Sequence, residues 1–427
     1  MGGGSSKKYQ YGSDSPMENQ SNEVSPNLNM TPVSNERSGP CFSDTIHTKN
    51  KIATKKEVEE LLKLLGGFEK WHVLNEDCRR EVVKYLDYES RFNLSICSKN
   101  DHETVEKTKI YVESVEILDN QKFHEEFDNV TVVIRLPDGN YSLQYKWVFS
   151  QLEQDTRVEW PHYISPQHPV PKEVIWKSCN YLEEAVKFAE KWMKKSNFEM
   201  EEVTIEMVKY PFATSQIKSF ACCRDMRVRS NDLDSIEWWL KKCPEQLEQF
   251  HVYVYGDRKS FTLPSDFLNE PKIMQASRRI SFGCRAAFSD EQLLKLKSKT
   301  IWFDSVDVTD RGINKFIENW VHGKSVPGFK EAHISAATVR DPEEIIAGLD
   351  YFEWDEAFKK DHSEFVEHFN LNSYSGLCYQ IKSKVNPFES LSLGVDENRV
   401  SISATGIRAE HNGEAYTHYR IPNFYED

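Results

Sequence analysis

Short strand patterns that alternate with single helices constrain the fold of this chain more than any other feature. Amphipathic helix patterns lie between the strands, with apolar residues recurring three and four positions apart. A spacing of roughly 25 to 30 residues is typical of a stack in which each unit needs its neighbour to bury its apolar face. The sequence therefore predicts an irregular, leucine-rich-repeat-like domain. The strand candidates are 203–207, 226–229, 250–254, 279–284, 300–303 and 332–334.

Two hairpin patterns flank this region. Tyr141, Leu143, Tyr145 and Trp147 alternate with polar residues after a turn at 137–140, and such alternation is typical of a strand with one buried face. A second hairpin is predicted around the turn at 396–398. Apolar residues alternate before the turn at Leu391, Leu393 and Val395, and they alternate after it at Val400, Ile402 and Ala404. Residues 350–369 before it predict one acidic helix, and the whole C-terminal part is expected to cap the stack.

Three short helices are predicted between residues 71 and 105. Glu76 and Asp77 place negative charge at the start of the first, where the helix dipole favours it. The apolar side of this first helix carries Cys78, Val82, Tyr85 and Leu86. A second helix is expected to begin at Phe92. Asn100 and Asp101 are expected to cap a third. Helices this short cannot bury all of their apolar surface among themselves, so the remainder must face the rest of the chain or a partner.

This segment resembles the F-box. The resemblance covers an aromatic residue at Trp71, Leu74, the Val-Val-x-x-Leu helix and a second helix that ends Cys-Ser-Lys. It implies a partner, the Skp adaptor of a cullin–RING ubiquitin ligase, and adaptor-binding residues Leu74, Val82, Val83, Leu86, Leu94 and Cys97. Asn75 stands where the family usually has proline, which predicts weaker adaptor binding. The alternative is that these helices merely cap the larger domain.

A second block, residues 308–323, looks like the F-box-associated domain of the large nematode-expanded F-box families. Together the two resemblances run from about residue 68 to about residue 334, and they imply a substrate receptor with its adaptor at one end and an unknown target protein at the other. The fold class expected is α+β, with a short α-helical F-box followed by a mixed helix–strand, leucine-rich-repeat-like domain with β-hairpins. A rival interpretation is a scaffold protein whose degenerate F-box no longer binds the adaptor.

Composition narrows the possible ligands. The formal charge of −14 argues against nucleic acid, because phosphate binding needs a concentrated basic surface. The nine cysteines form no CxxC pair and the thirteen histidines no HxxxH pattern, so neither a metal site nor a disulfide framework is indicated. No cofactor is predicted. A reducing, cytoplasmic location is expected, or a nuclear or peripheral-membrane one if the chain is acylated.

The first fifty residues are rich in Ser, Asn, Pro and Gly, and they are predicted to be disordered. Gly2 fits a myristoylation pattern, and Lys7 and Lys8 follow it. One acyl chain with two lysines would give only weak membrane association; the alternative is a flexible start that is never acylated. Residues 51–65, before Gly66 and Gly67, predict an amphipathic helix.

Catalytic residues are not apparent. An activated thiolate needs a basic or helix-terminal setting, and no sequence signature ties a histidine to Cys222 or Cys223, so structural cysteines are expected. Among the tryptophans, Trp239 and Trp302 are the candidates for target contact, because aromatic anchors dominate interface energies. An unrecognised enzyme would instead predict a concave pocket with converging polar groups in the helix–strand region, whereas the receptor interpretation predicts an apolar groove on the F-box and no such pocket.

The predicted organisation follows these boundaries. The parts are a tail at 1–50, a helix at 51–67, an F-box at 68–109, a hairpin region at 110–160, an F-box-associated domain at 161–345 and a C-terminal cap at 346–427.

Overall fold

A computed structural model describes residues 68–120, 129–138, 141–162, 170–368 and 376–419. The described residues lie in one compact unit that spans Asn50–Asp427. The predicted disordered tail, the predicted helix at 51–65 and Gly2 fall outside the described residues. Within them, no helix is both long and apolar enough to cross a membrane.

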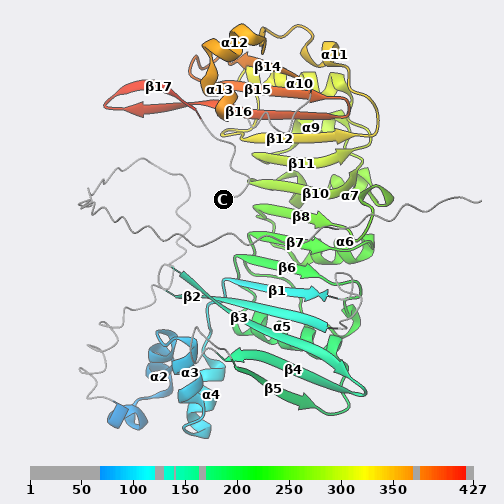
Figure 1. The fold of residues 1–427 in the computed structure, drawn as a ribbon. Helices are drawn as coiled ribbons and strands as arrows, with labels where there is room; N and C mark the ends of the chain where they lie inside the picture. The colour runs from blue at the N-terminus through cyan, green and yellow to red at the C-terminus, as the bar shows by residue number, and fades with distance from the viewer. Residues whose placement is uncertain (1–67, 121–128, 139–140, 163–169, 369–375, 420–427) are drawn as a thin grey trace, which may run out of the picture. The chain divides into compact units, whose positions relative to one another are not determined.

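Short helices come first along the described chain (Figure 1). They are the 3-10 helix η1 (Phe68–Val73), α2 (Glu76–Lys84), α3 (Tyr88–Ser95) and α4 (Lys99–Lys107). Polar side chains cap each α-helix: Asn75 accepts from the Cys78 N–H, Asp87 from the Ser90 N–H and Ser98 from the Asp101 N–H. The second predicted helix therefore begins four residues earlier than expected, because Asp87 starts it rather than interrupting the first.

One sheet then runs through the rest of the described chain. Its middle strands pair in parallel, each with the next along the sheet (Figure 1). In order, they are β1 (Ser114–Asp119), β6 (Glu202–Glu206), β7 (Asp225–Arg229), β8 (Gln249–Tyr253), β10 (Arg279–Ala286), β11 (Thr300–Ser305) and β12 (Glu331–Ala336). The short β9 (Thr262–Leu263) pairs with the end of β10.

Helical segments connect these strands and cover one face of the sheet (Figure 1). They are α5 (Tyr181–Lys195), η3 (Phe212–Thr214), α6 (Leu233–Lys242), η4 (Arg258–Ser260), α7 (Ser265–Leu268), α8 (Pro271–Met274), α9 (Asp290–Lys295) and α10 (Asp310–Val321). The capping box predicted before α9 is present: the Ser289 side chain accepts from the Gln292 N–H, and the Gln292 side chain accepts from the Ser289 N–H. The predicted repeat-like α+β fold is confirmed.

Antiparallel strands extend the sheet at both ends. Beside β1 lie β2 (Asn129–Asp138), β3 (Tyr141–Leu152), β4 (Asp155–His162) and β5 (Val170–Trp176). Beyond β12 lie β16 (Arg399–His411), β15 (Ser390–Asp396), β14 (Leu377–Lys382) and β13 (Tyr351–Glu353), and β17 (Glu414–Tyr419) pairs with the far half of β16. Because β1 pairs with both β2 and β6, the hairpin region and the repeat-like region share one sheet.

The C-terminal part agrees with the sequence in one respect and differs in another. The hairpin has the predicted register, with Val395 opposite Val400 and Leu393 opposite Ile402. The single helix predicted over 350–369 is wrong. Its start is strand β13, which pairs with β14, and α12 (Glu356–Asp361) begins only at the Asp355 cap, with α13 (Ser363–His368) after it. The remaining helix is α11 (Pro342–Ile346).

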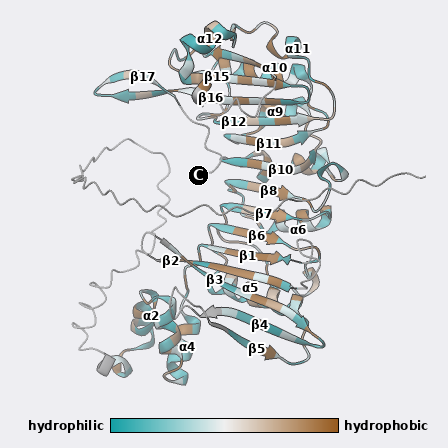
Figure 2. Cartoon of the chain, viewed as in Figure 1, coloured by the Kyte–Doolittle hydropathy of each residue, from teal (hydrophilic) through white to brown (hydrophobic). Residues whose placement is uncertain are grey.

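Alternation along the strands separates two faces. The rows that point toward the helices are apolar and buried; one reads Val203, Met226, Phe250, Ile280, Ile301 and Ala332 across six neighbouring strands. They form one core with the helices. The opposite face, which we call the open face, carries mainly polar residues. Figure 2 shows the contrast with the first helices, because α2 and α4 are mostly hydrophilic, whereas the strands include hydrophobic stretches.

Candidate functional site

The first helices are fixed to the sheet through α3. The buried Arg91 guanidinium donates to the backbone carbonyls of Leu86 (3.0 Å), Lys84 (3.1 Å) and Lys109 (3.1 Å), which joins the end of α2 to the chain that enters the sheet. Burial lowers the pKa of Arg91 to about 10, so the group stays charged at neutral pH. The ring of Tyr88 packs against those of Tyr145 on β3 and Trp192 on α5, with distances between ring centroids of 5.0 Å and 5.3 Å.

The 3-10 helix is tied to α4. The Trp71 indole donates to the Asp101 carboxylate at 2.6 Å, and the other oxygen of that carboxylate accepts from the Ser98 hydroxyl at 2.7 Å. The aromatic residue of the F-box resemblance therefore has a structural role, since it closes the short helices on themselves. Helices this short are marginal alone, and these contacts supply the support that they need.

Two of the predicted adaptor-binding residues do not reach the surface. Val83 and Leu94 are buried, because α2 and α3 turn these side chains inward. Helical periodicity marks an apolar face without saying whether the chain itself or a partner covers it. We therefore correct their predicted role to core packing. Leu74 and Val82 are half-buried, and Cys97 is exposed.

Leu86 is also half-buried, but it faces the sheet. It lines a cavity of about 260 Å³ between the end of α2, the start of α3 and the β2–β3 hairpin. Tyr85, Leu136, Leu143 and Tyr145 line the same cavity. A substitution at Leu86 would therefore also disturb the packing of the helices on the hairpin, and its contact with the adaptor stays a prediction.

Other apolar side chains of the first helices do reach the surface. Phe92 and Ile96 are 55% and 68% exposed, and they lie four residues apart along α3 and its C-cap, so their side chains share one side of the helix. Val73 is also exposed, at the end of η1. We name Val73, Phe92 and Ile96 the apolar surface of the F-box helices. The four-residue spacing of Phe92 and Ile96 was a sequence signal that could have revealed this pair.

The open face of the sheet holds a second candidate site. Register across neighbouring parallel strands places side chains 21 to 31 residues apart in sequence beside one another. Two of the polar rows read Glu202, Asp225, Gln249, Arg279, Thr300, Glu331, and Thr204, Arg227, His251, Ser281, Trp302, His333. All of these residues except Thr204 line a hollow of about 580 Å³.

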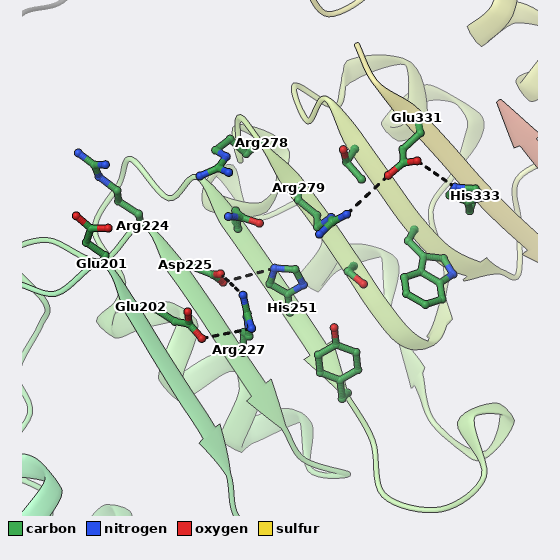
Figure 3. Close-up of a pocket in the computed structure, with 15 residues that line it drawn as sticks. Glu201, Glu202, Arg224, Asp225, Arg227, His251, Arg278, Arg279, Glu331 and His333 are labelled. Carbon is green, nitrogen blue, oxygen red and sulfur yellow. Dashed lines mark hydrogen bonds and ion pairs between the residues drawn. The ribbon is translucent and has the colours of Figure 1, made fainter. Parts of the chain in front are cut away.

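Ion pairs organise this hollow (Figure 3). The Arg227 guanidinium lies between two carboxylates, with nitrogen–oxygen distances of 2.7 Å to Asp225 and 3.3 Å to Glu202. The Glu331 carboxylate lies between the Arg279 guanidinium, at a nitrogen–oxygen distance of 3.7 Å, and the His333 ring, at 3.4 Å. Carboxylates therefore hold the guanidinium groups in place along the strands.

Burial changes the acid–base behaviour of some of these carboxylates. It raises the pKa of Asp225 despite the Arg227 guanidinium beside it, and it raises the pKa of Glu206 despite Arg229 at 3.0 Å. The pKa of Glu116 on β1 is raised for the same reason. Desolvation of the charged form outweighs ion pairing at all of these positions.

The two tryptophans predicted as target contacts have different positions. Trp239 is wholly buried on α6, where its ring packs against those of Tyr210 and Trp238 with a distance of 4.8 Å between ring centroids in each pair. Its predicted role in target contact is therefore wrong, because the inward face of an amphipathic helix holds it in the core. Trp302 is 46% exposed and lines the hollow on the open face.

The polar hollow in the repeat-like region is the feature that the unrecognised-enzyme alternative predicted, and the receptor interpretation, which predicted no such pocket, was wrong on this point. Strand alternation explains the hollow, since every second residue of each parallel strand points to the face that no helix covers. Burial raises the pKa of both Cys222 and Cys223, and the described residues contain no group of three His, Cys, Asp or Glu side chains placed to hold a metal ion.

Comparison with known proteins identifies the family. Residues 71–113 match the F-box domain, and residues 270–334 match the F-box associated family. The chain is 40% identical over 382 residues to an uncharacterized F-box protein of Caenorhabditis elegans, in an alignment that covers 88% of this chain and 98% of that relative. No solved structure matches the chain. The short capped helices and the sheet that follows them thus belong to a member of the F-box protein family.

Proposed function

We propose that this chain is the substrate-recognition subunit of a Skp–cullin–RING ubiquitin ligase. In this function the F-box helices bind the Skp adaptor, and the open face of the sheet receives an unknown target protein. Ubiquitin transfer then belongs to the other subunits, and the chain acts by holding its target near them. The observation that carries the proposal is the match to an F-box in helices that present apolar side chains to solvent.

The adaptor contact is best assigned to the apolar surface of the F-box helices. Val73, Phe92 and Ile96 expose apolar area that the described part of the chain leaves uncovered, and burying such area drives most protein association. Leu74, Val82 and Cys97 keep enough exposure to contribute. Aromatic residues are the usual anchors of such contacts, so Phe92 is expected to contribute the most.

A scaffold with a degenerate F-box remains the rival function, and Asn75 is the residue that raises it. The Asn75 side chain accepts a hydrogen bond from the Cys78 N–H at 2.8 Å and so caps α2. The helix start is therefore intact without proline, which favours the receptor over the degenerate F-box.

Co-purification of the full chain with purified Skp adaptor tests this proposal. A Phe92→Asp/Ile96→Asp double variant is expected to lose binding by more than about tenfold, because two charges would enter an apolar contact. Val339→Asp is the matched control, since Val339 is equally exposed but lies outside the F-box helices. Wild-type and control binding with loss in the double variant supports the receptor. No binding by the folded wild-type chain contradicts it and favours the scaffold.

A further inference from the structure

The middle of the hollow on the open face is a slot centred on strand β10. Along β10 the open-face positions are Arg279, Ser281 and Gly283, so the floor is low between longer side chains on both sides. Tyr253 of β8 leans over Gly283, where an added Cβ atom would lie 2.8 Å from the tyrosine ring. Trp302 of β11 pairs in register with Ser281 and stands on the other side.

Neutral polar side chains also line this slot. Gln249, Ser281 and Thr300 are buried residues whose side chains border the hollow. They lie next to one another in the register, with Gln249 opposite Arg279 and Arg279 opposite Thr300. Their amide and hydroxyl groups can donate hydrogen bonds to a ligand in the slot.

Charge indicates what kind of ligand this is. The side chains of Arg224, Arg227 and Arg278 are 43%, 42% and 38% exposed and that of Arg279 is 21% exposed, whereas those of Asp225 and Glu331 are 9% exposed and that of Glu202 is 20% exposed. Each of these arginines is ion-paired with a carboxylate, but the guanidinium group is the more exposed partner in each pair, so a ligand in the hollow meets more cationic than anionic surface. Guanidinium groups with hydroxyl and amide donors are suited to oxyanions.

We infer that this slot binds an acidic segment of the target protein, with carboxylate or phosphate oxygens at Arg279, Ser281 and Thr300 and a neighbouring apolar side chain on Trp302. The inference rests on the proposed function, because it names the chemistry of the segment that the receptor takes. The Gln249 amide donates to the same oxygens or to the backbone of the segment. The adjacent Trp302 supplies the apolar contact that ion pairs at an exposed surface lack.

A peptide array tests the inference with the fluorescently labelled full chain. The peptides share a Gly-Ser background with one tyrosine, and the residue beside the tyrosine is glutamate, phosphoserine, glutamine or lysine. We expect the acidic peptides to bind at least fivefold more strongly than the glutamine peptides, and we expect added salt to reduce the difference. Preference for glutamate and phosphoserine alike identifies a general oxyanion site, whereas preference for phosphoserine alone identifies phosphate as the source.

Variants assign the preference to the slot. Arg279→Gln and Thr300→Val are expected to remove most of it, and Trp302→Ala, at an exposed position, is expected to weaken all peptides. Arg408→Gln is the matched control, because it removes an exposed arginine of β16 outside the hollow. No preference for acidic peptides, or a preference unchanged in folded Arg279→Gln, overturns the inference.

Adaptor binding by the same variants separates this inference from the proposed function. Skp binding without a preference for acidic peptides contradicts the slot alone. A preference for acidic peptides that depends on the slot, without Skp binding, contradicts the ligase assignment and leaves the slot standing.

Discussion

The F-box helices and the open face of the sheet bind, in this account, by opposite physical means. The helices expose apolar side chains such as Phe92 and Ile96 and keep their charges in local pairs such as Arg80 with Glu76. The open face exposes arginines and keeps carboxylates beneath them. One surface needs a partner to cover apolar area, and the other needs a partner with complementary charge. A single chain can therefore hold two different proteins without competition between them.

The largest effect is expected in the core beneath the open face, where a buried tryptophan is compared with one exposed on that face. Trp239→Ala removes a wholly buried indole, and such truncations cost about 3–5 kcal/mol of unfolding free energy. Trp302→Ala removes an exposed indole and is expected to cost less than about 0.5 kcal/mol. Chemical denaturation of both variants checks this contrast. Equal losses would mean that Trp302 belongs to the core and not to a binding surface.

The attachment of the F-box helices is tested next by Arg91. Arg91→Leu leaves three carbonyl groups without their donor, and we expect a loss of roughly 2–4 kcal/mol in local stability. Hydrogen exchange should then speed up in α2 and α3 but not in β7 and β8. Arg80→Leu is the control, because its ion pair with Glu76 is exposed and should matter little. Equal acceleration in both regions would contradict a separately attached helical unit.

A smaller effect is expected at the start of α2. Proline at position 75 suits the backbone, whose φ is −66°, but it removes the side-chain cap, which costs about 0.5–2 kcal/mol. Asn75→Pro is therefore expected to destabilise α2 about as much as Asn75→Ala, and amide exchange across Glu76–Lys84 measures both. If the proline variant is instead as stable as the wild type, the cap does not hold this helix.

The smallest effect is expected in the pH dependence of the unfolding free energy, where Asp225 on the open face and Glu76 on the F-box helices contribute with opposite signs. Burial raises the pKa of Asp225, so the folded state takes up its proton more readily than the unfolded state. The stability from this group is present below its ordinary value of 3.8 and is lost as pH rises through the raised pKa. Asp225→Asn should remove this loss. The measurement is the unfolding midpoint of wild type and variant between about pH 4 and pH 7.

Glu76 serves as the control for this dependence. Arg80 and Lys107 lower its pKa, so its contribution is present above its ordinary value of 4.5 and is lost as pH falls through the lowered pKa. Glu76→Gln should therefore change the profile in the opposite direction. The same direction in both variants would contradict the contrast between a desolvated open face and solvated helices.

The sequence predicted the frame of the molecule better than its surfaces. Apolar alternation located the strands and the C-terminal hairpin, because both patterns are local. Strand β13 was missed because its pairing with β14 depends on residues 26 to 30 positions away. The slot was missed for a similar reason, because Gln249, Arg279 and Thr300 become neighbours only through the register of three strands.

The F-box helices show a different limit. Their existence follows from the spacing of apolar residues, and the resemblance supplied the partner. The spacing did not distinguish buried Leu94 from exposed Phe92, because both are apolar and lie in the same short helix. Packing of Tyr88 and Arg91 against the sheet decides which side of α3 faces outward, and those contacts depend on distant residues of the chain.

Hydrogen exchange of the full chain with and without purified Skp adaptor reports on both binding regions at once. We expect slower exchange in α2, α3 and α4 on adaptor binding, with the amides of β7, β8, β10 and β11 unchanged. Protection of those strands in place of the helices, or no change anywhere at saturating adaptor, would contradict a receptor that holds its adaptor and its target on separate surfaces.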